Sequence, residues 1–143
     1  MIVKIVNKSD NPDPKYQTAG SVGMDICANL ENFVVLEPGI CQIIPTGIYM
    51  EIPEGYECQV RPRSGLAVKY GITVINTPGT VDSDYRGEIK IALINLGAFP
   101  HSIHNGDRIA QLVFNKVELI TVEKVTELST TERNEGGFGS TGK

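Results

Sequence analysis

The chain has 143 residues and a formal net charge of −4, with 41% hydrophobic and 21% charged residues. This length is typical of one domain with its own core, and the absence of long like-charge runs argues against a nucleic-acid-binding surface. No apolar run approaches the roughly 18 residues of a membrane span, and strand-like sequence follows Met1 directly. We therefore expect no signal peptide, no membrane partner and a cytoplasmic protein.

Glycine and proline interrupt the sequence about every ten residues, and short β-prone segments lie between them. This spacing predicts an all-β sandwich or barrel. The expected strands are Ile2–Val6, Phe33–Leu36, Gln42–Ile44, Gly47–Ile52, Glu57–Pro62, Ile72–Ile75, Glu88–Asn95 and Asp107–Phe114.

Alternation of apolar and polar residues identifies the inward faces of three of these strands. The core residues that it predicts are Ile48, Met50, Ile52, Cys58, Val60, Ile89, Ile91 and Leu93. Helix signals are nearly absent. We expect one short helical turn over Ser64–Tyr70, with Ser64 as the N-cap and Gly71 as the terminator.

The cysteines and histidines do not indicate a redox or metal site. Cys27, Cys41 and Cys58 are odd in number and lack C-x-x-C spacing, so we expect buried thiols in a reducing compartment. A disulfide, metal ligands or a nucleophile are the alternatives. His101 and His104 would point to opposite faces of a strand, which favours surface or loop histidines over a metal pair.

The C-terminal sequence is rich in glycine and matches parts of two nucleotide-binding motifs. Residues 137–142 read G-x-G-x-x-G, and residues 137–143 match the first part of a P-loop. Both motifs need a strand before the loop and a helix after it, whereas here a polar segment precedes and the chain stops, so both are rejected. We expect a domain over residues 1–128 and a flexible arm over 129–143 that closes over a phosphorylated, ring-bearing ligand.

Four further segments carry more chemistry than ordinary turns need. The segment of residues 62–67 places the guanidinium of Arg63, the hydroxyl of Ser64 and the unhindered N–H of Gly65 in succession. This set suits a phosphate group, although a capped strand-to-helix turn explains it equally well. The four segments are residues 19–25, 62–67, 76–87 and 106–112.

The third segment lies between two expected strands and is open to two interpretations. It is long enough for a plain hairpin built from common turn formers. It also offers the amide of Asn76, the carboxylate of Asp82 and the ring of Tyr85 within ten residues.

The first and last segments each contain one polar residue of interest. Asp25 ends the flexible loop of the first. In the last, Gln111 is expected on the same strand face as Ile109 and Val113, and an amide among apolar neighbours needs a partner. That partner is either a ligand or the backbone.

Together with the arm, these segments resemble the five motifs of the homotrimeric dUTP nucleotidohydrolases (dUTPases), in the same order and spacing. The resemblance runs from about Ala19 to Gly142. It implies a jelly-roll-like β-fold with one short helix and a flexible C-terminal arm. It also implies hydrolysis of dUTP to dUMP and pyrophosphate with Mg²⁺, which keeps uracil out of DNA and supplies dUMP for thymidylate synthesis. In that family, three chains form a homotrimer and share their sites.

The same resemblance implies a role for each matching residue. Asp82 would activate the water that attacks the α-phosphorus, and Asp25 would contact Mg²⁺ through water. The residues implied for the phosphates are Arg63, Ser64, Gly65, Gln111, Arg133, Ser140 and Thr141. Those implied for uracil and deoxyribose are Asn76, Gly79, Thr80, Val81, Asp82, Tyr85, Lys90, Phe138 and Gly139.

A dCTP deaminase and a nucleotide-gated interaction protein are the two alternative functions. A dCTP deaminase would share the fold but needs a carboxylate arranged for attack at C4 of cytosine and normally a longer chain, whereas residues 82–87 and Phe138 favour a dUTPase. A nucleotide-gated interaction protein would have kept the pocket and lost turnover, and the presence of Asp82 argues against that loss. The chain departs from the family at Asn134, where glycine is usual, but asparagine also tolerates left-handed backbone.

Overall fold

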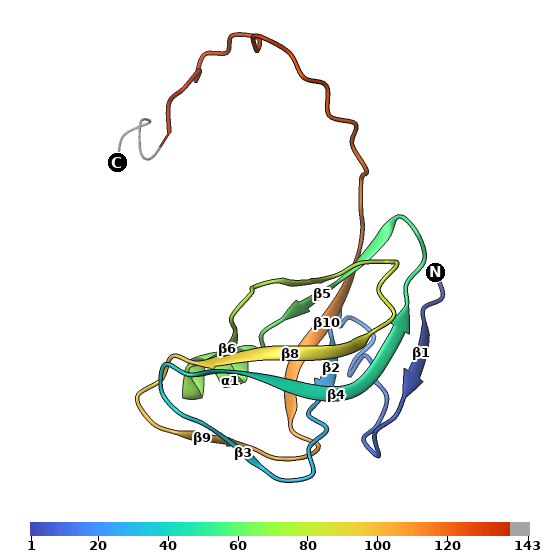
Figure 1. The fold of residues 1–143 in the computed structure, drawn as a ribbon, viewed down its shortest axis with the longest axis vertical. Coiled ribbons are helices and arrows are strands. Elements are labelled where there is room, and N and C mark those ends of the chain that lie inside the picture. Colours follow the sequence, from blue (N-terminus) through green and yellow to red (C-terminus); the bar gives the residue numbers. More distant parts are fainter. Residues whose placement is uncertain (138–143) are drawn as a thin grey trace.

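The computed structural model of the protein describes residues 1–137, in which ten strands and one helix form a β-sandwich (Figure 1). The all-β expectation is confirmed. The helix is α1 (Ser64–Tyr70). The strands are β1 (Lys4–Asn7), β2 (Met24–Cys27), β3 (Val34–Leu36), β4 (Cys41–Glu51), β5 (Tyr56–Arg61), β6 (Ile72–Val74), β7 (Gly79–Val81), β8 (Glu88–Asn95), β9 (His101–Ile103) and β10 (Arg108–Lys116).

Two four-stranded sheets, with strand orders β1-β4-β8-β6 and β2-β10-β5-β7, form the body of the sandwich, and a third sheet pairs β3 with β9. Every pairing is antiparallel. From β4 to β8, successive strands alternate between the two large sheets. Such crossing between sheets is the mark of a jelly-roll-like fold.

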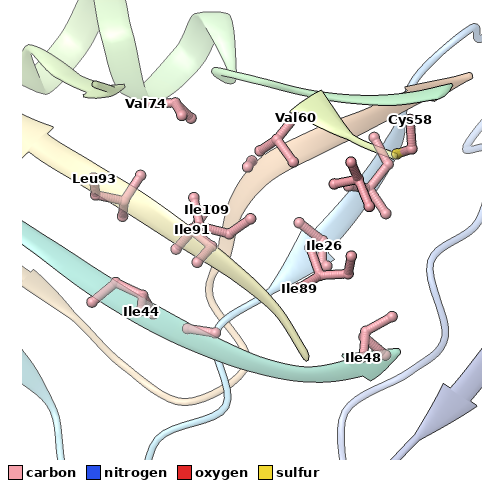
Figure 2. Close-up of a cluster of buried hydrophobic side chains, with 14 of the residues drawn as sticks. Ile26, Ile44, Ile48, Cys58, Val60, Val74, Ile89, Ile91, Leu93 and Ile109 are labelled. Atoms are coloured by element: carbon pink, nitrogen blue, oxygen red, sulfur yellow. The ribbon is translucent and has the colours of Figure 1, made fainter. Parts of the chain in front are cut away.

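The hydrophobic core lies between the two large sheets, where their inward side chains meet (Figure 2). Ile44, Ile91 and Leu93 come from one sheet, and Ile26 and Val60 come from the other. Each is at most 5% exposed, and burial of this kind contributes about 25 cal/mol per Å² of apolar surface. The rows predicted by alternation on β4, β5 and β8 are all buried, so that prediction is confirmed.

Three short strands were missed, and two expected strands are one. β2, β7 and β9 have only three or four residues and lie in turn-rich sequence. They form strands because they pair with neighbouring strands, and local sequence gives little sign of them. Gln42–Ile44 and Gly47–Ile52 join in β4. The ladder between β4 and β8 is irregular between Pro45 and Tyr49, where Gly47 has φ 71° and the N–H groups of Thr46 and Gly47 donate to Oε1 of Glu88.

The helix has the predicted bounds but a different N-cap. Arg63 is the N-cap residue, with extended backbone and no side-chain capping bond, and its carbonyl accepts the N–H of Ala67. The prediction of Ser64 as N-cap is therefore wrong by one residue. Gly71 ends the helix as predicted, at φ 71°, and a Cβ there would lie 2.4 Å from the backbone nitrogen of Gly97.

The expectation of three buried thiols holds only in part, although all three cysteines are free. Burial raises the pKa of the Cys58 thiol to about 12, and burial is also the main cause of the raised pKa of half-buried Cys27. Cys41 is exposed, because it is the first residue of β4 and its side chain lies on the outer face of that strand.

The two histidines lie in different surroundings. His104 is exposed in a loop, as expected, and lies near the ring of Phe33, whereas His101 is half-buried in β9 against Tyr70. Residues 1–137 contain no group of three or more His, Cys, Asp and Glu side chains that could hold a metal ion. In the same range, no helix is long and apolar enough to cross a membrane.

Asn95, at the end of β8, is a fully buried amide with three hydrogen bonds. Its Nδ2 donates to the carbonyl oxygens of Leu36 and Phe99, both at 2.8 Å, and its Oδ1 accepts the N–H of Gly97 at 2.8 Å. These bonds tie β3 and the β8–β9 loop to the end of β8.

Replacement of Asn95 by alanine should lower the free energy of unfolding by about 2 kcal/mol or more, because three backbone groups lose their partner. Asn115→Ala is the matched control, since the buried Nδ2 of Asn115 has no hydrogen-bond partner within residues 1–137. Urea unfolding of both variants measures the difference. Equal losses of unfolding free energy in the two variants would show that the three hydrogen bonds of Asn95 do not contribute to stability beyond what removal of a buried amide costs.

Candidate functional site

Three of the sequence-predicted residues meet on the outer face of the sheet β2-β10-β5-β7. Asp25 on β2 is the register partner of Gln111 on β10, which in turn is the register partner of Arg61 on β5. Arg63 follows two residues after Arg61, at the start of α1. We call Asp25, Arg63, Gln111 and their neighbour Arg108 the Asp25 cluster.

Two guanidinium groups hold the carboxylate of Asp25. Arg63 Nε donates to Oδ1 at 3.0 Å, and Arg108 Nη1 donates to Oδ2 at 3.1 Å. Arg63 Nη1 also donates to the carbonyl oxygen of Arg108 at 2.9 Å. The side chain of Asp25 is only 16% exposed, so both oxygens have charged partners where water is scarce.

In this structure the side-chain amide of Gln111 is bonded to the backbone, which is one of the two partners that the sequence left open. Gln111 Nε2 donates to the carbonyl oxygen of Pro62 at 2.9 Å. Gly23 leaves room for this amide, because a Cβ there would lie 2.3 Å from Gln111 Oε1. The prediction that Gln111 and Ile109 share a strand face is wrong. Ile109 is buried in the core, because the β2–β10 register shifts between Arg108 and Ala110.

Ser64 and Gly65 project from this cluster at the first turn of α1, and both are exposed. A Cβ added to Gly65 would meet nothing within 4 Å. Their hydroxyl and N–H groups are therefore open to an anion. The bonds that fix Pro62 and Arg63 also fix the direction in which these groups point.

The hairpin of residues 76–87 connects β6 to β8, which pair with each other, and it contains β7, which pairs with β5. Gly79 is buried there, and a Cβ on it would lie 3.1 Å from Nδ2 of the Asn76 side chain. At the turn, the N–H of Tyr85 donates to the carbonyl of Asp82, and the hydroxyl of Tyr85 donates to the carbonyl of Glu88 at 3.1 Å. The carboxylate and the ring are thus presented by one short, hydrogen-bonded turn.

A cavity of about 310 Å³ opens between this hairpin and β8. That volume is at the lower end of the range for small-molecule sites. Asp82 lines it and also borders a second cavity of about 520 Å³ beside Ser83 and Asp84. The first cavity is lined by Ile43, Thr80, Val81, Asp82, Tyr85, Glu88, Ile89, Lys90 and Ala92.

The predicted site residues therefore fall into two groups within one chain. Arg63 and Arg108 line a different cavity, of about 350 Å³, together with His101 and Asp107. Arg133 joins neither group: its Nε donates to the carbonyl of Gly136 at 2.7 Å, and its segment runs away from the sheets (Figure 1). The remaining predicted residues, Phe138, Gly139, Ser140 and Thr141, lie outside the described residues.

Sequence reasoning assigned no role to Arg108, although it belongs to the Asp25 cluster. Its segment was singled out for Gln111, and a strict two-residue alternation would place residues 108 and 111 on opposite faces. Asn134 has the positive φ (42°) that was expected of asparagine at a glycine position.

Comparison with known proteins gives consistent matches over almost the whole chain. The family model described as dUTPase matches residues 9–142. A deoxyuridine 5′-triphosphate nucleotidohydrolase of Finegoldia magna is 58% identical over 142 residues, covering 99% of each chain. One of Cytophaga hutchinsonii is 55% identical over 141 residues, covering 99% of this chain and 92% of its own.

Solved structures give the same result. The dUTPase of Staphylococcus bacteriophage 80alpha with dUpNHpp superposes with a TM-score of 0.88 at 27% identity, covering 99% of this chain and 98% of its own. A dUTPase of phage phi11 of S. aureus that coordinates a structural Mg(II) ion has a TM-score of 0.79 at 24% identity, covering 89% and 98% of the two chains. That second likeness supports the fold alone.

Proposed function

Because the chain belongs to the dUTPase family, we propose that it hydrolyses dUTP to dUMP and pyrophosphate by attack of an activated water on the α-phosphorus. The reaction removes a precursor of uracil in DNA and supplies dUMP for thymidylate synthesis. The observation that carries the proposal is the hairpin cavity, whose rim holds the carboxylate of Asp82 and the ring of Tyr85. The free thiols suit a reducing cytoplasm.

The hairpin reads the base. The backbone of Thr80–Asp82 and the amide of Asn76 pair with the edge of uracil, and Lys90 adds a main-chain contact from β8. A methyl group at position 5 would not fit a tight hairpin, which excludes thymine. Cytosine presents the opposite pattern of donors and acceptors, and unpaired buried groups of this kind discriminate by about 10⁴-fold or more.

Tyr85 selects the sugar. Its ring stacks under the deoxyribose and occupies the space that a 2′-hydroxyl would need. The support is its fixed position: the hydroxyl is bonded to the carbonyl of Glu88, and a Cβ on Gly87 would lie 2.3 Å from that hydroxyl oxygen. Only glycine at position 87 leaves the ring where it is.

Arg63 and the first turn of α1 hold the phosphates. Ser64 and Gly65 supply an exposed hydroxyl and an exposed N–H. Arg63 keeps unused N–H donors after binding Asp25 and the backbone. Gln111 assists through its bond to the carbonyl of Pro62, which fixes the loop.

Magnesium fits this site as an ion held mainly by the substrate. Mg²⁺ keeps several waters and needs few protein ligands. Asp25 would contact it through water, since each carboxylate oxygen accepts one guanidinium bond and retains one free acceptor position. When bound, the ion offsets negative charge on the triphosphate.

We further propose that three copies of the chain assemble and complete each other's sites. Asp82 and Arg63 line different cavities of one chain, whereas one nucleotide must meet both. The segment after β10 exposes large apolar side chains that a neighbouring copy would cover. They are Leu119, Ile120, Val122, Val125 and Leu128.

The arm of residues 129–143 completes the site from a neighbouring chain. Phe138 covers the uracil ring, Arg133 binds the terminal phosphate, and Gly139, Ser140 and Thr141 contact the phosphates. Fifteen extended residues at ~3.3 Å each reach about 50 Å, which is enough to cross to another subunit.

Replacement of Asp82 by asparagine should lower kcat by about 10²–10⁴-fold and leave nucleotide binding largely intact, because the amide cannot accept the proton of the attacking water. Asp84→Asn is the matched control, since Asp84 is an exposed carboxylate two residues away in the same loop. Pyrophosphate release and dUpNHpp titration measure the two effects. Near-normal turnover in Asp82→Asn would remove Asp82 from its role.

Replacement of Tyr85 by alanine should reduce the preference for dUTP over UTP by about tenfold or more, because space opens at the 2′-position. Tyr85→Phe keeps the ring and loses only the bond to Glu88, so it should retain most of the preference. The ratio of kcat/KM for the two nucleotides is the measurement. An unchanged ratio in Tyr85→Ala contradicts the stacking role.

A further inference from the structure

A β-bulge places Arg108 over Asp25. On β2, Asp25 and Cys27 are two residues apart and share a face. Their register partners on β10 are Gln111 and Arg108, which are three residues apart, because the register shifts between Arg108 and Ala110. Ile109 is thus the extra residue, and it is buried in the core (Figure 2). Bulges redirect side chains in this way and occur often beside active sites.

Arg108 supports the Asp25 cluster with both its side chain and its backbone. Its guanidinium binds the carboxylate oxygen that Arg63 leaves open, at 3.1 Å. Its carbonyl accepts Nη1 of Arg63 at 2.9 Å. Asp25 and Arg63 are therefore each held at two points, and Arg108 is common to both.

As a stabilising ion pair, the bond from Arg108 to Asp25 is weakened by solvent, because the side chain of Arg108 is 50% exposed. Its geometric effect is larger. A carboxylate bound from two sides by separate guanidinium groups cannot rotate freely, so its two remaining acceptor positions keep a fixed direction.

We propose that Arg108 is a positioning residue for the reaction proposed above. It fixes the Asp25 carboxylate in the orientation that receives the hydrated metal and, through its carbonyl, fixes Arg63 at the start of the phosphate-binding turn. The bulge at Ile109 is the feature that brings Arg108 to this place. This role depends on the proposed function but concerns a residue that acts through Asp25, without contact to the nucleotide.

A double-mutant cycle tests the role directly. Affinity for dUpNHpp is measured with Mg²⁺ for the unchanged chain, Arg108→Ala, Asp25→Ala and the double variant. Arg108→Ala alone should weaken binding by about tenfold, and in the Asp25→Ala background it should change binding by less than about twofold. Equal losses in both backgrounds would show that Arg108 acts on the phosphates through its own charge, and would overturn the proposal.

Two controls complete the experiment. Lys116→Ala removes an equally charged, exposed residue from the other end of β10 and should leave affinity unchanged; an equal loss there contradicts a specific role of Arg108. If Arg108→Ala does not fold, the cycle is run with Arg108→Gln, which keeps an amide donor, and a loss that persists without Asp25 again overturns the proposal. Failure of the unchanged chain to release pyrophosphate from dUTP would instead contradict the proposed function.

Discussion

The proposed function depends on one constraint, which is that Asp82 and Arg63 line different cavities of one chain. Asp82 lies at the rim of the hairpin cavity on β7 and β8, and Arg63 lines another cavity beside β9 and β10. A nucleoside triphosphate has its base and its phosphates on one short molecule, so neither cavity alone suffices. We therefore propose that assembly of several chains is part of the chemistry, because it would bring the hairpin that we assign to the base to the turn that we assign to the phosphates.

Each half of the proposed site is held by bonds that involve backbone groups, so each half is ordered within a single chain. The Asp25 cluster fixes Pro62 and Arg63, and therefore the first turn of α1. The hairpin is fixed by β5–β7 pairing and by the Tyr85 hydroxyl. Pre-ordered donors of this kind stabilise developing charge without reorganisation during the reaction.

Much of this arrangement could be predicted from the sequence, since alternation identified the core rows and Gly71 identified the helix end. The resemblance to a family placed the motifs in order. Arg108 was missed for a physical reason: one inserted residue at Ile109 changes which side chains share a face, and periodicity cannot reveal a bulge. Likewise, exposed Cys41 and the short strand β2 are decided by pairing between distant segments, which no local pattern contains.

Mixing two inactive variants tests shared sites most directly. Asp82→Asn and Arg63→Gln chains are purified, shown separately to have little activity, unfolded together in equal amounts and refolded. If each site takes its hairpin and its phosphate-binding turn from different chains, some sites receive an intact Asp82 and an intact Arg63, and random assembly restores about a quarter of the normal activity. Activity that stays at the sum of the two separate variants would mean that each chain builds its site alone.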